Sequence, residues 1–529
     1  MSFVIRGRSA VPTVLAAAIT LLLAGCTASV LAGHGSSSGS PRPPGSVSGP
    51  PNFPSVPKAD FFDCSSGVNI SALGLPAGRR ARLSFECARL AVPLDYADPN
   101  GNHIDLQLIR VHDSDNHDSP VHSLIVNPGG PGGSGVNLAL GIAGQVSDAL
   151  LKHFDLVGFD PRGVNFSSPI RCLSDNEKDR QSLLAPDVLT PAGFAQAKSL
   201  AQQLADKCNA KYGADLAQYN TVQTAKDMEL IREAVGDDAM NYLGFSYGTE
   251  LGAQYIHLFP THVRVAVLDG AVDPLTNDIT SFANQLRGFE DSFDQFAKWC
   301  TGHSPCSGLG DPRQAVYDIA DRASKSPIPS SATGETRKAT NAIVYVGVLS
   351  ALYSRAQWPT LGRSLLDARH GDSAGLFQLA DRYNERYHGH YTNIADANTT
   401  ISCNDAKPGP SDARIRATAA SWAKRFPMFG LWSAASLFGC QQWQPHRTVP
   451  PKPTAPSTPH KILVVGNLHD PATPYQGAKD LTNTLGNAEL LTWNGEGHTS
   501  YLEGSHCVDN YVDDYLIRGT LPPAGTTCR

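Results

Sequence analysis

The sequence predicts an α/β fold in which a mostly parallel β-sheet is flanked by helices. Short apolar runs that end in Gly or Asp alternate along the chain with longer stretches of helical character, which is the pattern of such a sheet. The chain has 529 residues, of which 41% are hydrophobic and 17% are charged. This composition excludes a chain that is disordered throughout, and it supplies enough apolar side chains for a large core.

Five apolar runs are the candidate strands of the sheet, and each is followed by glycine or polar residues. The runs are 123–127, 154–160, 241–245, 263–268 and 461–466. In an open α/β sheet, sites form at the carboxyl ends of the strands. We therefore expect the functional residues in the loops that follow these runs.

The third run leads into Gly244-Phe245-Ser246-Tyr247-Gly248 and then into a predicted helix that begins near Thr249 and reaches Pro260. A G-x-S-x-G segment between a strand and a helix is typical of a nucleophile elbow, a sharp turn that exposes a reactive serine. The two glycines leave room for the strand and the helix to pass closely. Ser246 is therefore the candidate nucleophile, and an ordinary Gly-Ser turn is the alternative.

A reactive serine needs a base and an acid that orients the base, and after an elbow they follow in the order Ser, Asp or Glu, His. Asp470 follows the strand predicted at 461–466, and His498 follows a strand-like run, 489–493, through a glycine-containing loop. Loops after two neighbouring strands can bring both side chains to the serine. Thr473 lies three residues after Asp470 and is placed to hydrogen-bond its carboxylate.

Other residues remain open for the same two roles. Asp269 and Asp273 follow the strand predicted at 263–268 and are alternative acids. His469 and His506 are alternative bases. Their positions in the chain do not exclude them.

The segment 127–135, Asn-Pro-Gly-Gly-Pro-Gly-Gly-Ser-Gly, predicts an oxyanion hole. Acyl transfer passes through an oxyanion, which fixed donors, usually backbone N–H groups, must stabilise. We expect one donor from Gly130 and the other from Tyr247, directly after the nucleophile. A phosphate-binding loop is the alternative, but the segment lacks the Gly-Lys-Ser/Thr ending and has Pro131 where an N–H is needed.

The N-terminal segment has the features of a bacterial lipoprotein signal. Two arginines precede an uncharged segment, 11–33, which contains a ten-residue apolar run. The run is followed by Ala24-Gly25-Cys26, which with Leu23 resembles a lipobox, in which the Cys thiol takes a diacylglycerol before cleavage. We expect residues 1–25 to be the signal peptide and Cys26 the lipid-anchored N-terminus. A retained membrane helix is the alternative, because the uncharged segment is long enough to span a bilayer.

Residues 26–57 are then the anchor and a tether. Gly, Ser and Pro occupy 18 of the 23 positions from Gly35 to Pro57, a composition typical of a flexible linker. We expect an exported domain held by this tether on the outer side of the cytoplasmic membrane. The 43 basic and 49 acidic residues give a formal net charge of -6, so no nucleic-acid partner is expected.

Ten cysteines follow Cys26, which in an exported chain predicts five disulfide bonds. Their connectivity does not follow from the sequence, and pairing of sequence neighbours, beginning with Cys64 and Cys87, is adopted as a hypothesis. Zinc is the competing use, but there is no Cys-x-x-Cys, and the close pair Cys300 and Cys306 has only His303 as a further ligand. We therefore expect neither a metal nor another cofactor.

Several segments resemble a known family, the secreted and often lipid-anchored tripeptidyl-aminopeptidase-like hydrolases of actinobacteria, which lie within the proline-iminopeptidase group of α/β-hydrolases. The similar segments are 92–96, 127–132, 160–163, 244–249, 268–274, 470–474 and 497–498. They are distributed over residues 60 to 529. Two features depart from the simpler iminopeptidases: the loop begins with Asn127 where those enzymes usually have His, and cysteines are more numerous.

The resemblance implies an α/β-hydrolase fold with a core formed by residues 58–274 and 456–529 and a helical cap inserted over 275–455. It also implies a peptidase or an esterase. An exopeptidase needs a wall behind the substrate N-terminus and a carboxylate that meets its ammonium group, which would otherwise lose hydration unpaired. Glu290 and Asp291 in the cap are the candidate carboxylates.

Three functions remain open. The first is a serine exopeptidase that releases N-terminal tripeptides from peptide or protein substrates. The second is a carboxylesterase or lipase, because the same triad cleaves esters more easily than amides. The third is a non-catalytic solute-binding lipoprotein, which the anchor and tether suit but which gives no reason for an elbow with an ordered Asp and His.

Overall fold

The computed structural model describes residues 53–116, 122–274, 278–445, 449–455 and 458–529. Its centre is a ten-stranded sheet with the order β1-β2-β3-β5-β4-β6-β7-β10-β11-β12. The strands are β1 Phe62–Asp63, β2 Leu83–Pro93, β3 His103–Asp113, β4 His122–Asn127, β5 Phe154–Phe159, β6 Met240–Phe245, β7 Val263–Asp269, β10 Ile462–His469, β11 Ala488–Glu496 and β12 Thr527–Cys528. Neighbours from β5 to β12 pair in parallel, whereas the pairs β1·β2, β2·β3 and β3·β5 are antiparallel. The predicted α/β fold is confirmed.

Helices cover both faces of this sheet, which explains why central strands such as β5 and β6 are buried along their whole length. On one face pack α2 Gly135–Ile142, α3 Asp148–Leu151 and α17 His506–Arg518. On the other pack α6 Thr221–Val235, α7 Tyr247–Leu258 and α16 Tyr475–Leu485. A short helix, α1 Ala77–Arg82, precedes β2.

Glycine determines how closely α2 can approach the sheet. A Cβ atom added to Gly135 of α2 would lie 2.1 Å from the carbonyl oxygen of Phe159, and one added to Gly158 of β5 would lie 2.2 Å from the carbonyl oxygen of Gly135. No side chain fits at either position. The loop before α2 is thereby held directly over the carboxyl ends of the central strands.

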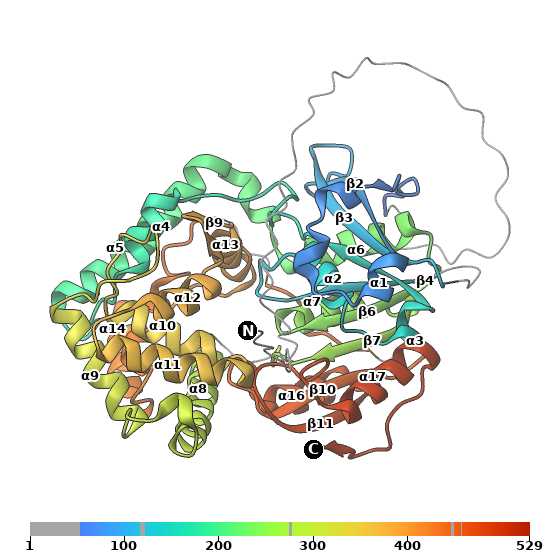
Figure 1. Cartoon of the computed structure of the whole chain (residues 1–529). Helices are drawn as coiled ribbons and strands as arrows, with labels where there is room; N and C mark the ends of the chain where they lie inside the picture. The colour runs from blue at the N-terminus through green and yellow to red at the C-terminus, as the bar shows by residue number, and fades with distance from the viewer. Residues whose placement is uncertain (1–52, 117–121, 275–277, 446–448, 456–457) are drawn as a thin grey trace, which may run out of the picture.

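The remaining helices form a second lobe beside the sheet (Figure 1). Between β7 and β10 the chain forms α8 Asp278–Thr301, α9 Pro312–Lys325, α10 Asn341–Leu352, α11 Trp358–Arg369, α12 Ala374–Tyr383, the hairpin β8 Arg386–Tyr387 and β9 His390–Tyr391, α13 Ile394–Asp405, α14 Asp412–Arg425 and α15 Gly430–Ser433. Short 3-10 helices are η1 Ser65–Gly67, η2 Ile70–Leu73, η3 Gly213–Gln218, η4 Pro260–His262, η5 Ser304–Cys306, η6 Arg355–Gln357 and η7 Ala434–Phe438. We call the part between β7 and β10 the cap.

A segment that the sequence analysis did not assign to the cap also packs on it. The chain between β5 and β6 forms α4 Asp175–Ser182 and α5 Pro191–Tyr212, which lie against the cap in Figure 1. The ring of Phe194 in α5 meets that of Phe438 edge-on at 4.8 Å, within one apolar cluster shared with the cap. The helical lobe is therefore built from two separate parts of the chain.

The described cysteines form five disulfide bonds, all between sequence neighbours, so the pairing hypothesis is confirmed. The bonds are Cys64–Cys87, Cys172–Cys208, Cys300–Cys306, Cys403–Cys440 and Cys507–Cys528. Each closes a loop within one local region, and such cross-links stabilise the fold mainly by restricting the unfolded chain.

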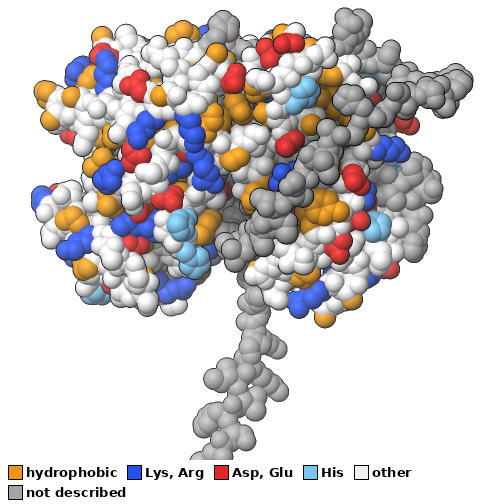
Figure 2. All heavy atoms as spheres, turned by 90° about the horizontal axis from the view of Figure 1, so that it is seen from above, with side chains coloured by type: hydrophobic (Ala, Val, Ile, Leu, Met, Phe, Trp, Pro, Cys, Tyr) orange, Lys and Arg blue, Asp and Glu red, His pale blue; other side chains and the backbone are white. Residues whose placement is uncertain are grey.

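Charged side chains are mixed over the surface. On the face in Figure 2, basic and acidic residues are interspersed rather than gathered by sign. Within the described ranges, none of the helices combines the length and the apolar character needed to cross a bilayer. Cys26 and the predicted signal peptide lie outside the described residues.

Candidate active site

Ser246 lies at the turn between β6 and α7, in the left-handed backbone region with φ 55° and ψ -127°. A non-glycine residue is held there only when its surroundings enforce it. Its N–H donates to the carbonyl oxygen of Asp269 at 2.9 Å. A Cβ atom added to Gly244 would lie 2.4 Å from the carbonyl oxygen of Gly248. A Cβ atom added to Gly248 would lie 2.9 Å from the carbonyl oxygen of Asn127. The glycines thus have the function that the sequence analysis assigned to them.

His498 and Asp470 lie together at the carboxyl ends of the neighbouring parallel strands β10 and β11. Nδ1 of His498 is 2.9 and 3.0 Å from the two carboxylate oxygens of Asp470. The carboxylate also accepts backbone N–H groups from Ala472, Thr473 and Thr499 at 2.8 to 3.0 Å. These donors fix the orientation of the carboxylate, which in turn fixes the imidazole.

Thr473 contacts both members of this pair. Its hydroxyl donates to Asp470 Oδ2 at 3.0 Å and lies 3.3 Å from His498 Nδ1. Asp470 and His498 are almost fully buried. The hydroxyl is therefore a further donor to a carboxylate that has little access to solvent.

The alternative acid and base have other partners. Asp269 accepts the N–H groups of Ser500 and Tyr501 at 2.9 and 2.8 Å, and burial raises its pKa to about 7. It thus holds the loop after His498 without a hydrogen bond to the imidazole among the described contacts. His469 lies 3.0 Å from Asp291 through its Nδ1.

The glycine loop after β4 passes directly over the elbow. A Cβ atom added to Gly129 would lie 2.8 Å from the Tyr247 nitrogen and 2.9 Å from Ser246 Cβ. The loop is held by the Gly129 N–H, which donates to Asn127 Oδ1 at 2.9 Å. Among the hydrogen bonds of the described residues, none occupies the N–H of Gly130 or of Tyr247. Two backbone donors therefore remain beside Ser246.

A cavity of about 700 Å³ lies between the core and the cap, a size typical of small-molecule sites. Ser246, His498 and the glycine loop line it from the core. Its cap residues include Tyr353, Tyr383, Glu385, Tyr387 and Asn398.

The cap also holds the histidine loop. The N–H of His498 donates to the carbonyl oxygen of Tyr353 at 2.8 Å, and the two rings meet at 90° with centroids 5.3 Å apart. Next to them, Ser354 and Gly497 form an isolated antiparallel β-bridge. The orientation of the imidazole therefore depends on the docking of the cap.

Glu290 and Asp291, the carboxylates that the sequence suggests for the substrate ammonium group, are not among the residues that line this cavity. Glu290 accepts the N–H groups of Met428 and Phe429 and lies 3.0 Å from Arg313. The carboxylates of Glu290 and Asp291, both in α8, therefore have partners within the fold.

The carboxylates that do line the cavity are Glu385 and Glu503, which the sequence analysis missed. Neither belongs to a periodic segment or a motif. Only the tertiary packing of a short hairpin and of the loop after His498 brings them there.

Behind the elbow lies a half-buried carboxyl pair, Glu250 of α7 and Asp405 at the end of α13. Burial raises the pKa of Glu250 to about 7. Burial and the nearby Glu250 raise the pKa of Asp405. Asp405 accepts the hydroxyl of Thr221 at 2.6 Å, and that hydroxyl also contacts the phenol of Tyr247. The pair therefore lies against the residue that follows the nucleophile.

In the ranges that the structure describes, no three His, Cys, Asp or Glu side chains converge in a way that would hold a metal ion. The polar groups of the cavity are those of an acyl-transfer site: a serine at an elbow, an oriented histidine and free backbone donors.

Comparison with known proteins indicates the same class of protein, a serine hydrolase. A family profile described as TAP-like protein matches residues 426–528. Serine protease Hip1 of Mycobacterium tuberculosis is 38% identical over 466 residues, covering 84% of this chain and 87% of the relative. Carboxylesterase B of the same species is 38% identical over 455 residues, covering 84% and 86%. Tripeptidyl aminopeptidase of Streptomyces lividans is 30% identical over 481 residues, covering 89% and 86%.

The half-buried Glu250 predicts a pH-dependent stability. Its folded pKa of about 7 lies above its ordinary value of 4.5, so between these values the folded state binds more protons than the unfolded state and stability falls as pH rises. Glu250→Gln removes this titration. We expect the Tm of the variant, measured relative to wild type, to rise steadily from pH 4.5 to pH 7. A Tm difference that is constant over this interval would contradict the assignment.

Proposed function

The chain belongs to the family of serine hydrolases that includes serine protease Hip1 and the Streptomyces tripeptidyl aminopeptidases, and on this basis we propose that it releases N-terminal tripeptides from peptide or protein substrates. The observation that carries the proposal is the oriented His498–Asp470 pair, which shares one capped cavity with Ser246. A cap over the cleft supplies the wall that an exopeptidase needs.

In the proposed reaction, Ser246 attacks the scissile carbonyl while Nε2 of His498 takes the serine proton. Asp470 accepts Nδ1–H, which fixes the imidazole tautomer and stabilises the imidazolium as it forms. The N–H groups of Gly130 and Tyr247 stabilise the oxyanion. His498 then donates the proton to the leaving amine, and water hydrolyses the acyl-enzyme by the same steps.

Thr473 is a positioning residue in this scheme. Its hydroxyl donates to Asp470 and lies beside His498 Nδ1, so it restricts both side chains to the geometry that the proton transfer requires.

Ester hydrolysis is the second candidate, because a relative with 38% identity is named carboxylesterase B. The triad and oxyanion donors serve both reactions. A solute-binding function would leave the serine unreactive, so covalent labelling by a fluorophosphonate distinguishes it from either hydrolase.

The triad assignment predicts distinct effects for two aspartates. Ser246→Ala should abolish turnover and fluorophosphonate labelling. Asp470→Asn should lower kcat by a factor of the order of 10⁴, because the wrong tautomer of His498 is favoured. Asp269→Asn is the matched control and should be much milder, because Asp269 bonds only backbone N–H groups of the loop. If Asp470→Asn keeps a kcat near that of wild type while Asp269→Asn loses most of it, Asp269 is the acid of the triad.

The exopeptidase proposal predicts a preference for a free N-terminus. We expect kcat/KM to be highest for a tripeptidyl amide, lower for its N-acetylated twin, and lowest for a long blocked peptide that offers only internal bonds. Equal cleavage of all three would contradict an exopeptidase. Rapid ester turnover with no cleavage of any peptide would favour the esterase.

We also propose that the enzyme is an exported lipoprotein, acylated at Cys26 and held outside the cytoplasmic membrane by residues 26–57. The lipobox-like segment before Cys26 supports this location. Cys26→Ala should abolish acylation and release or mislocalise the protein, as measured by detergent partitioning of cell fractions. A variant that partitions like wild type would instead indicate a retained apolar helix.

A further inference from the structure

Glu385 brings an unpaired carboxylate into the cavity. Its side chain lines the cavity together with Ser246, and its hydrogen bond is to the hydroxyl of Thr392 at 2.5 Å. No Lys, Arg or His forms an ion pair with it among the described residues. Burying a carboxylate costs free energy unless a cation or several donors compensate it. The cavity therefore contains a half-buried carboxylate without an ion-pair partner, and Arg382, which also lines the cavity, forms no ion pair with it within the described ranges.

The backbone places this carboxylate at a cost. Glu385 has a φ of 50°, in the left-handed region that a residue with a Cβ enters at about 1–2 kcal/mol. The residue directly precedes the hairpin β8–β9. Such a conformation persists only where the surrounding structure enforces it.

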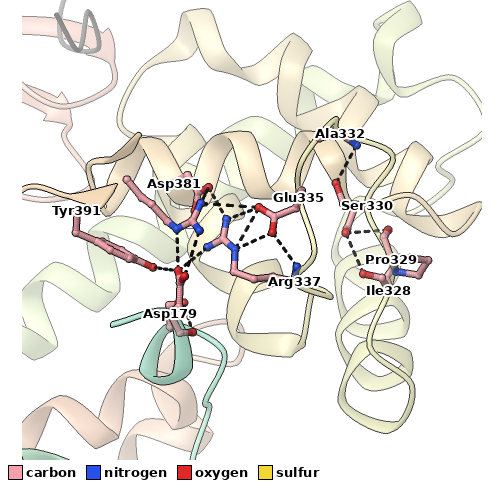
Figure 3. A network of polar contacts seen from close by, with 12 residues as sticks. Asp179, Ile328, Pro329, Ser330, Ala332, Glu335, Arg337, Asp381 and Tyr391 are labelled. Atoms are coloured by element: carbon pink, nitrogen blue, oxygen red, sulfur yellow. Dashed lines mark hydrogen bonds and ion pairs between the residues drawn. The ribbon is translucent and has the colours of Figure 1, made fainter. Parts of the chain in front are cut away.

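An ion network that includes Asp179, Glu335, Arg337 and Asp381 holds the residue that follows Glu385 (Figure 3). Arg386, the next residue, donates to both carboxylate oxygens of Asp179 at 2.7 and 3.1 Å and lies 3.4 Å from Asp381. Arg337 joins Asp381 and Glu335, each at 2.5 Å. The side chain of Arg386 is thus paired within this network and does not line the cavity, whereas that of its neighbour Glu385 does.

A second anchor ties Glu385 to the core. The N–H of Thr392 donates to the carbonyl oxygen of Glu385 at 3.1 Å. The adjacent Asn393 is buried and donates to the carbonyl oxygens of Gly163 and Ile170 at 2.7 and 2.8 Å. The position of the carboxylate is thus fixed relative to the lobe that contains Ser246.

The other cavity carboxylate does not suit a cationic ligand. Burial, with the nearby carboxylates of Asp269 and Asp509, raises the pKa of Glu503 to about 8, so it is mostly neutral at pH 7. It follows the histidine loop in the core, whereas Glu385 belongs to the opposite wall, in the cap. Burial also raises the pKa of Glu385, but no neighbouring carboxylate adds to this effect and the Thr392 hydroxyl opposes it. A cation in the cavity would stabilise its ionised form.

We propose that Glu385 binds the α-ammonium group of the substrate and so restricts cleavage to bonds near a free N-terminus. The inference rests on the proposed exopeptidase function and adds to it the residue that selects the substrate. The ammonium group gains a charged acceptor in place of water, and Glu385 gains the cation that the fold does not supply. Glu290 and Asp291, whose carboxylates are occupied elsewhere, have no part in this contact.

The test is the ratio of kcat/KM for a tripeptidyl amide to that for its N-acetylated twin, measured for the full-length enzyme. In Glu385→Gln, which keeps the shape and removes the charge, we expect this ratio to fall about 10- to 100-fold, mainly through KM of the free-amine substrate. The acetylated substrate should change by less than about threefold. Glu385→Asp should recover part of the ratio, and Asp291→Asn, the matched control on the cap, should leave it at the wild-type value.

Three outcomes separate the failures. A wild-type enzyme that cleaves both substrates equally overturns the exopeptidase function itself. A wild-type preference that persists in Glu385→Gln overturns the role of Glu385 alone. If Glu385→Gln no longer reacts with a fluorophosphonate, its active site is disturbed and the test uses the variant Thr392→Val instead. Thr392→Val removes the hydroxyl that is bonded to Glu385. An unchanged ratio in that variant also overturns the inference.

Discussion

The strained turn at Ser246 is the constraint on which the rest of the site depends. Its backbone leaves β6 in the left-handed region because Gly244 and Gly248 let strand and helix almost touch. The same crowding brings the Gly129 loop within contact of the Tyr247 nitrogen. Because β6 lies at the centre of the sheet, its neighbours β4 and β7 deliver their own loops to the same point. The turn at Ser246 thus lies where the glycine loop after β4 and the end of β7 meet.

The cap is a structural part of the catalytic centre as well as its cover. Tyr353 accepts a hydrogen bond from the main chain of His498, and the bridge between Ser354 and Gly497 extends this contact. A displacement of the cap would therefore move the imidazole. Within the helical lobe, the packing of Phe194 on Phe438 joins its two parts, and the disulfide Cys403–Cys440 closes a loop of the cap.

Sequence patterns predicted the parts of the site that depend on local chemistry. Ser246 and its glycines form a contiguous motif, and Asp470 and His498 follow adjacent parallel strands, where chain order alone brings them together. The sequence did not reveal the partners of Glu290, whose carboxylate binds two N–H groups and an arginine from other parts of the cap. Glu385 was missed because a two-residue strand has no periodicity, and its position depends on ion pairs between segments far apart in the chain.

The buried carboxylates of this molecule are compensated in two ways. Away from the cavity, Asp227 is paired with Arg162 at 2.6 Å and Asp396 with Lys178 at 2.9 Å, all with almost no exposure. Asp269 has no such cation in the part of the chain that the structure describes and is held by backbone N–H groups. Glu385 has one hydroxyl donor and no ion pair among the described residues, although the next residue, Arg386, binds Asp179. In the proposed complex, the ammonium group of the substrate supplies the cation that Glu385 lacks.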